Sequence, residues 1–182
     1  MFIQTESTPN PSTLKFLPGV EVLTSGTADF STPDSAKASP LAQTLFAING
    51  VKGVFLGADF VTVTKDVKLE WPALKPLILA AIMEHFTSNK PVMLEGAAAP
   101  AANTNTGDAV IDQILELLET RVRPAVAQDG GNIEFDRFED GIVYLRLQGS
   151  CAGCPSSTAT LKSGIENMLR YYIPDIQEVR AV

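Results

Sequence analysis

The chain has 182 residues, 45% of them hydrophobic, and a formal net charge of -7. That length suits one or two compact units of roughly 75 to 100 residues. The acidic balance argues against nucleic acid and anionic membrane surfaces as partners, because Lys and Arg dominate binding to both. No apolar run approaches the ~20 residues of a membrane span, and residues 1–13 lack a basic leader pattern. We therefore expect a soluble protein with no nucleic-acid or membrane partner.

The first part of the chain, residues 1–94, predicts a small α+β domain. Its expected elements are, in chain order, strands over 2–5 and 13–17, an exposed loop over 26–39, a helix over 40–48, a hairpin of strands over 51–56 and 60–64, and an amphipathic helix over 71–86. His85 falls on the apolar side of that last helix. We expect it in the core rather than at a metal.

Small and polar residues without periodicity fill positions 95–107, which is typical of a flexible linker. The composition changes across this stretch. Lys is the only basic residue type before it, whereas every basic residue after it is Arg except Lys162. The sequence therefore predicts two domains, 1–94 and 108–182, joined by an Ala/Asn/Thr/Gly-rich linker.

Residues 108–182 also predict an α+β domain. The expected elements are a helix that starts at Asp108 and that Pro124 ends or kinks, strands over 133–138 and 142–147 joined by a tight turn, a helix over 156–172, and a third strand over 176–179. We expect no helix to follow a strand in parallel-sheet order. Each domain is then a short β-sheet covered by helices.

The only cysteines, Cys151 and Cys154, form a Cys-x-x-Cys loop that Pro155 follows at once. Two cysteines are too few for a secreted disulfide scaffold, so a reducing compartment is expected. Pro155 at the first helical position would place Cys154 at the helix N-cap, where the helix dipole lowers a thiol pKa. A tetrahedral zinc ion or an iron–sulfur cluster wants four strong ligands. A metal site here would thus take its second ligand pair from another copy of the chain.

Spacing alone leaves three interpretations of this loop. A redox dithiol and a dimer-bridging metal site have equal support, and the metal could be zinc or an iron–sulfur cluster. A thioredoxin-like dithiol usually lies inside a βαβ unit, which we do not expect here. Two buried structural cysteines are disfavoured because the flanking Ser, Ala and Gly residues offer little apolar cover.

The second domain nevertheless resembles a known family. The sequences Arg123-Pro124, Asp129-Gly130-Gly131-Asn132 and Gly149-Ser150-Cys151-Ala152-Gly153-Cys154-Pro155 are similar to the C-terminal domain of the NifU/Nfu iron–sulfur proteins. Residues 5–16, TESTPNPSTLKF, resemble the N-terminal domain of the Nfu branch. The full-length NifU of nitrogen fixation has further regions that would need many more cysteines.

This resemblance implies a carrier or scaffold for a [4Fe-4S] cluster, one per homodimer, held by Cys151 and Cys154 of each protomer. It also implies upstream assembly factors and apo-protein clients as partners, and no enzymatic activity. The compartment would be the cytoplasm for a bacterial protein, or the mitochondrial matrix for a processed eukaryotic form. The alternative is a thiol–disulfide oxidoreductase that uses the same two cysteines.

Overall fold

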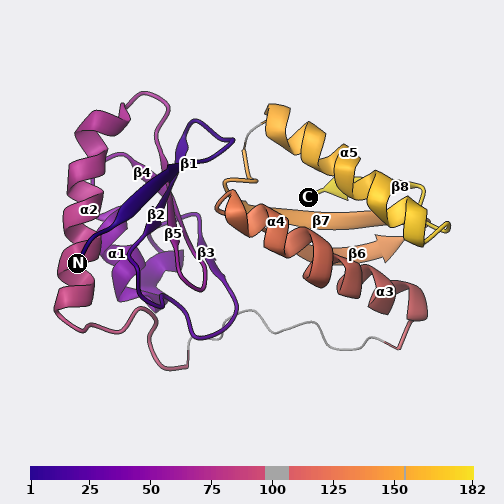
Figure 1. The fold of residues 1–182 in the computed structure, drawn as a ribbon, viewed down its shortest axis with the longest axis horizontal. Coiled ribbons are helices and arrows are strands. Elements are labelled where there is room, and N and C mark those ends of the chain that lie inside the picture. Colours follow the sequence, from indigo (N-terminus) through magenta and orange to yellow (C-terminus); the bar gives the residue numbers. More distant parts are fainter. Residues whose placement is uncertain (97–106, 154) are drawn as a thin grey trace.

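The fold comes from a computed structural model that describes residues 1–96, 107–153 and 155–182. Figure 1 shows two α+β units side by side, each with its own sheet and its own helices. The predicted fold class is therefore confirmed. Most of the predicted linker, 97–106, lies outside the described residues, so the proposed boundaries at 94 and 108 stay predictions. Among the described helices, none is long and apolar enough to cross a membrane.

The first sheet is antiparallel throughout, with the strand order β1-β2-β5-β4-β3. Its strands are β1 (Gln4–Ser7), β2 (Thr13–Leu17), β3 (Ala28–Phe30), β4 (Val51–Leu56) and β5 (Val61–Lys65). Two helices accompany it, α1 (Pro40–Phe46) and α2 (Trp71–Thr87). The two predicted hairpins and both predicted helices are present, because each combines a clear apolar period with turn residues at its ends.

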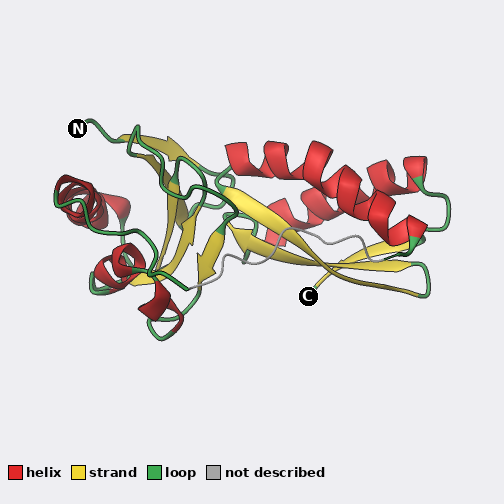
Figure 2. Cartoon of the chain, turned by 90° about the horizontal axis from the view of Figure 1, so that it is seen from below, coloured by secondary structure: helices red, strands yellow, loops and turns green. Residues whose placement is uncertain are grey.

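Helices α1 and α2 cover the face of this sheet that is turned away from the second domain (Figure 1 and Figure 2). Side chains alternate between the two faces of a strand. Phe16, Val54 and Val63 therefore enter the core under the helices. Their neighbours Phe55 and Thr62 point to the opposite face, and both are buried there as well.

The segment 26–39 was expected to be an exposed loop, and this is wrong in part. It contains β3, which pairs with β4, and a short 3-10 helix, η1 (Ser35–Ala38). Ala28, Phe30 and Ala36 are buried in the first core. A three-residue edge strand is too short to show a period, so only its pairing with β4 reveals it.

The second sheet has three strands, β6 (Gly131–Glu139), β7 (Ile142–Gly149) and β8 (Glu178–Ala181), in that order. Asp140 and Gly141 join β6 to β7 with φ values of 51° and 76°, as a two-residue hairpin loop of type I′ requires. Three α-helices, α3 (Ala109–Leu117), α4 (Arg123–Gln128) and α5 (Pro155–Tyr172), lie on one face of this sheet (Figure 2).

Strands β7 and β8 pair in parallel, with α5 as the crossover between them. The expectation that no helix follows a strand in parallel-sheet order is therefore wrong. Helix α5 has 18 residues, about 27 Å of helix, and this matches the ~26 Å of an eight-residue strand. It returns the chain to the starting end of β7, so that the next strand must run parallel to it.

The helical path of this domain continues through Pro124, but it is irregular just before this residue. A π-helical turn, η2 (Leu118–Val122), connects α3 directly to α4, and Pro124 lies in the first turn of α4. The wider turn accommodates a residue that has no N–H to donate. The predicted apolar stripe survives this change, since Ile114, Leu118 and Val122 are all buried.

Candidate functional site

The cysteine loop leaves the end of β7 through Gly149, whose φ is 62°. Two hydrogen bonds tie Ser150 to the turn before β6. Its N–H donates to the Gly130 carbonyl at 3.3 Å, and its hydroxyl donates to the Asp129 carbonyl at 2.5 Å. The Ala152 N–H donates back to the Gly149 carbonyl at 3.1 Å. Backbone hydrogen bonding thus fixes the start of the loop against the second sheet.

Cys151 is buried and packs with the core of the second domain. The expectation that this loop lacks apolar cover is therefore wrong for Cys151. Its sulfur reaches this position because Gly131 lies opposite, where a Cβ would overlap Sγ. Cys154 lies outside the described residues. Its role at the N-cap stays a prediction, although α5 begins at Pro155 as expected.

Burial raises the pKa of the Cys151 thiol to about 11, and the nearby charge of Asp129 adds to the rise. The Ser150 side chain has a smaller influence in the opposite direction. The lowered thiol pKa that we expected for the loop is thus not found at Cys151. In this conformation Cys151 is protonated at neutral pH.

A cavity of about 440 Å³ opens beside Cys151. Its lining comes from both domains and consists of Pro9, Val126, Asp129, Ser150, Cys151, Thr160 and Leu161. Pro9 belongs to the turn between β1 and β2, so the first domain reaches the cysteine loop. Sequence analysis missed this contact.

Side-chain hydrogen bonds join the first domain to the segments around Cys151. They run from Asn10 Nδ2 to the Ala152 carbonyl (3.1 Å), from Lys15 Nζ to the Gln128 carbonyl (3.1 Å), from Thr62 Oγ1 to the Gly130 carbonyl (2.8 Å), and from Asn132 Nδ2 to Thr27 Oγ1 (3.0 Å). No local sequence pattern predicts them, because the partners are 68 to 142 residues apart.

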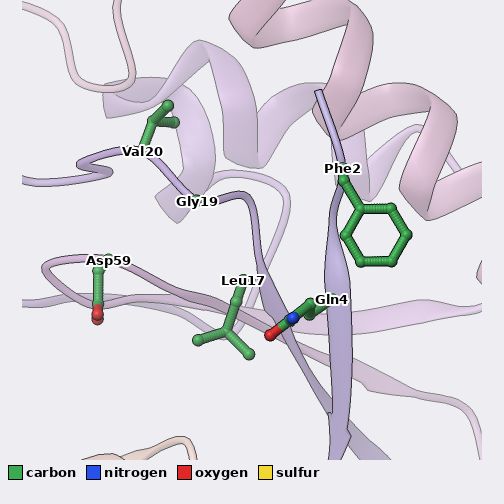
Figure 3. Close-up of a pocket in the computed structure, with 6 residues that line it drawn as sticks. All are labelled: Phe2, Gln4, Leu17, Gly19, Val20 and Asp59. Carbon is green, nitrogen blue, oxygen red and sulfur yellow. The ribbon is translucent and has the colours of Figure 1, made fainter.

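The described residues contain no group of three or more His, Cys, Asp or Glu side chains arranged to hold a metal ion. His85 is 2% exposed in α2, on the face of the first sheet that is turned away from the second domain (Figure 1). Its predicted place in the core is confirmed. A second cavity, of about 450 Å³, lies beside β1 and β2, where Phe2, Gln4, Leu17, Gly19, Val20 and Asp59 line it (Figure 3). That lining includes neither thiol nor imidazole.

Comparison with known proteins identifies the family. The model of the Nfu/NifU scaffold protein N-terminal domain matches residues 3–89, and the NifU-like domain model matches residues 114–180. A human protein named "NFU1 iron-sulfur cluster scaffold homolog, mitochondrial" is 54% identical over 183 residues, which cover all of this chain and 72% of the human protein. The chain belongs to the Nfu family. The resemblance of both its halves is thereby confirmed.

A plant relative leads to the same assignment. "NifU-like protein 4, mitochondrial" from Arabidopsis thaliana is 53% identical over 98% of this chain, and the match spans 65% of the plant protein. Among solved structures, a NifU-like protein from Saccharomyces cerevisiae is 28% identical with a TM-score of 0.48, over 52% of this chain and 86% of that one. The 65% coverage of the plant protein means that this Nfu chain spans about two thirds of that relative's length.

Proposed function

We propose that this Nfu chain carries a [4Fe-4S] cluster between two protomers and transfers it to apo-proteins. Cys151 and Cys154 of each protomer are the proposed ligands, with one cluster per homodimer. The carrier role is not enzymatic. The name of the human relative describes a mitochondrial iron–sulfur cluster scaffold homolog, which supports this function. The human and plant relatives are both named as mitochondrial, which favours a mitochondrial location over a bacterial cytoplasm.

The ligand count carries the proposal. The chain has two cysteines and one histidine, and that histidine is buried in α2 of the other domain. A [4Fe-4S] cluster takes four thiolates. The two cysteines of one chain are half of that set, and a second copy of the same loop supplies the other half.

A shared site also explains how a carrier releases its cargo. Four thiolates on a [4Fe-4S]2+ core leave a net charge of about -2, and the N-terminus of α5 after each loop offsets part of that charge. The binding free energy is divided between ligation and dimer association. Dissociation of the dimer removes two ligands from the cluster at once. An apo-client that binds the cluster then competes only with the two thiolates of the remaining protomer.

One structural observation favours the alternative, a thiol–disulfide oxidoreductase. Strand β7, helix α5 and strand β8 form a parallel crossover with Cys151 between the strand and the helix, as in a thioredoxin-like site. The raised pKa of Cys151 does not separate the two functions. The thiolate is both the attacking species in disulfide exchange and the ligand of a metal or cluster, so either function requires Cys151 to lose its proton.

Anaerobic reconstitution followed by native mass measurement tests the proposal. We expect a dimer with four irons and four sulfides, or about two irons per chain. Cys151→Ser and Cys154→Ser should each abolish cluster binding rather than halve it, because each substitution removes two of the four ligands. Ala152→Ser is the matched control, since it adds a hydroxyl at an exposed position of the same loop and keeps both thiols.

Two results would contradict the proposal. One is a monomer that holds a complete four-iron cluster, which would mean that other residues are ligands. The other is a protein that takes up no cluster and instead cycles a Cys151–Cys154 disulfide while reducing protein disulfides. That second result would establish the oxidoreductase.

A further inference from the structure

The outer face of the first sheet is buried, although none of the helices described in its own domain covers it. An antiparallel sheet commonly leaves one face in water. Here Phe55 and Thr62 are each 1% exposed and Lys15 is 7% exposed. Phe55 does not pack with the core under α1 and α2. The second domain lies against this face (Figure 1 and Figure 2), where β4 and β5 contact β7.

The two surfaces fit closely at two glycines of the second domain. A Cβ added at Gly130 would lie 2.9 Å from Thr62 Oγ1 and 3.4 Å from Lys15 Cβ. A Cβ added at Gly149 would lie 3.2 Å from Phe55 Cδ1. Real Cβ contacts are rarely this short. The side chains of the first domain therefore rest directly on the backbone that leads into and supports the cysteine loop.

Polar side chains of the outer face and of the turn beside it form hydrogen bonds with the second domain. Thr62 and Lys15, both buried, donate to backbone carbonyls of the other domain. Asn10 donates to the carbonyl of Ala152, which follows Cys151 directly. A buried polar group costs free energy unless it is hydrogen-bonded, and here the partners come from the other domain. This face is built as a docking surface rather than as solvent-exposed sheet.

We propose that the outer face of the first sheet docks the cysteine-bearing edge of the second domain within the same chain, and that this contact competes with cluster-bridged dimerisation. The competition rests on the function proposed above; the docking itself does not. In the docked chain, Pro9 lines the cavity at Cys151 and Asn10 binds the loop. A partner loop that shares one cluster with Cys151 must approach through this same space. The apo chain is docked, and loading with a cluster separates its domains.

The main variant is Asn10→Asp combined with Thr62→Val in the full chain. Asp keeps the Oδ1 acceptor that the Ser12 N–H uses, loses the donor to Ala152 and places a charged oxygen against that carbonyl. Val keeps the β-branched shape of Thr62 and loses the donor to Gly130. One net hydrogen bond changes an equilibrium about five-fold, so losing two shifts docking about twenty-five-fold, and the introduced charge adds to this shift.

Phe55→Thr is a second, independent variant, since it removes the aromatic contact with Gly149 and keeps a good strand residue. Thr44→Val is the matched control. Thr44 is exposed on α1, and its hydroxyl bonds only within the first domain, to the Pro40 carbonyl.

Rotational correlation times from NMR relaxation of the apo chain report docking without any cluster. We expect one correlation time for both domains in the wild type and in Thr44→Val, and two shorter ones in Asn10→Asp/Thr62→Val and in Phe55→Thr. The rate of anaerobic loading should rise in the two undocked variants, by about twenty-five-fold or more in the double variant. The loaded wild type should itself show separately tumbling domains.

Separate correlation times in the wild-type apo chain would overturn the docking. A single correlation time in both interface variants would do the same, because the proposed contacts would then hold nothing together. Undocked variants that load at the wild-type rate would overturn the competition. If no form of the protein takes up a cluster while the variants still undock, the proposed function fails and the docking surface stands.

Discussion

Replacing Gly131 with Ala tests whether the position of Cys151 depends on the absence of a side chain opposite it. A Cβ at this position would overlap Cys151 Sγ and would lie 3.0 Å from both the Cys151 nitrogen and the Gln148 carbonyl oxygen. Two of these three neighbours are backbone atoms that cannot rotate away. The sulfur must therefore move, and the end of β7 must shift with it.

Inserting a methyl group into a packed site of this kind costs about 1–3 kcal/mol. A loss of about 2 kcal/mol lowers the melting temperature of a domain of this size by roughly 8–16 °C. Gly131 is not among the residues with positive φ, so this cost is steric and does not come from backbone strain. Because the sulfur is displaced, the variant should also bind less iron after reconstitution.

Gly164→Ala provides the matched control in the same domain. Gly164 is exposed in α5, and a Cβ there would meet nothing within 4 Å. Ala in an exposed helix position is more favourable than Gly by up to about 1 kcal/mol, so this variant should be slightly more stable. Thermal or urea unfolding of both variants checks the pair. A Gly131→Ala protein as stable as the wild type, with normal iron content, would refute the close packing around Cys151.

Two further outcomes test the first domain. Ser39→Ala should destabilise it by about 1–2 kcal/mol in urea unfolding, because Ser39 caps α1 and also donates to the Val92 carbonyl at 2.5 Å. The control Ser88→Ala, at an exposed position, should change the stability little. Equal effects of the two substitutions would contradict the capping role. Burial, with the charge of Lys90, lowers the pKa of His85 below 6.5. The neutral imidazole therefore contributes its full stability to the fold above pH 6.5. This contribution is lost as the pH falls from 6.5 towards the pKa of His85 in the folded protein. NMR titration of the single imidazole should show a midpoint below 6.5, and a midpoint at or above it would contradict the burial.

Relatives place the chain in the Nfu family, and the sequence already predicted the local elements that carry the family pattern. The hairpin that includes strand 13–17 and the hairpin around the turn at 57–59 both combine alternating side chains with turn residues. These signals act within a few residues. The Cys-x-x-Cys spacing and the ligand count are also properties of the sequence alone, because no fold can add a thiol to the chain.

The tertiary structure decided what depends on distant partners. The edge strand Ala28–Phe30 exists through its pairing with β4, and the parallel direction of β8 follows from the path of α5 across the sheet. The raised pKa of Cys151 comes from core packing and from Asp129, 22 positions earlier in the sequence. The contact of the first domain with the cysteine loop joins residues more than 100 positions apart. Burial and long-range hydrogen bonding are set by the whole fold, so no short sequence pattern encodes them.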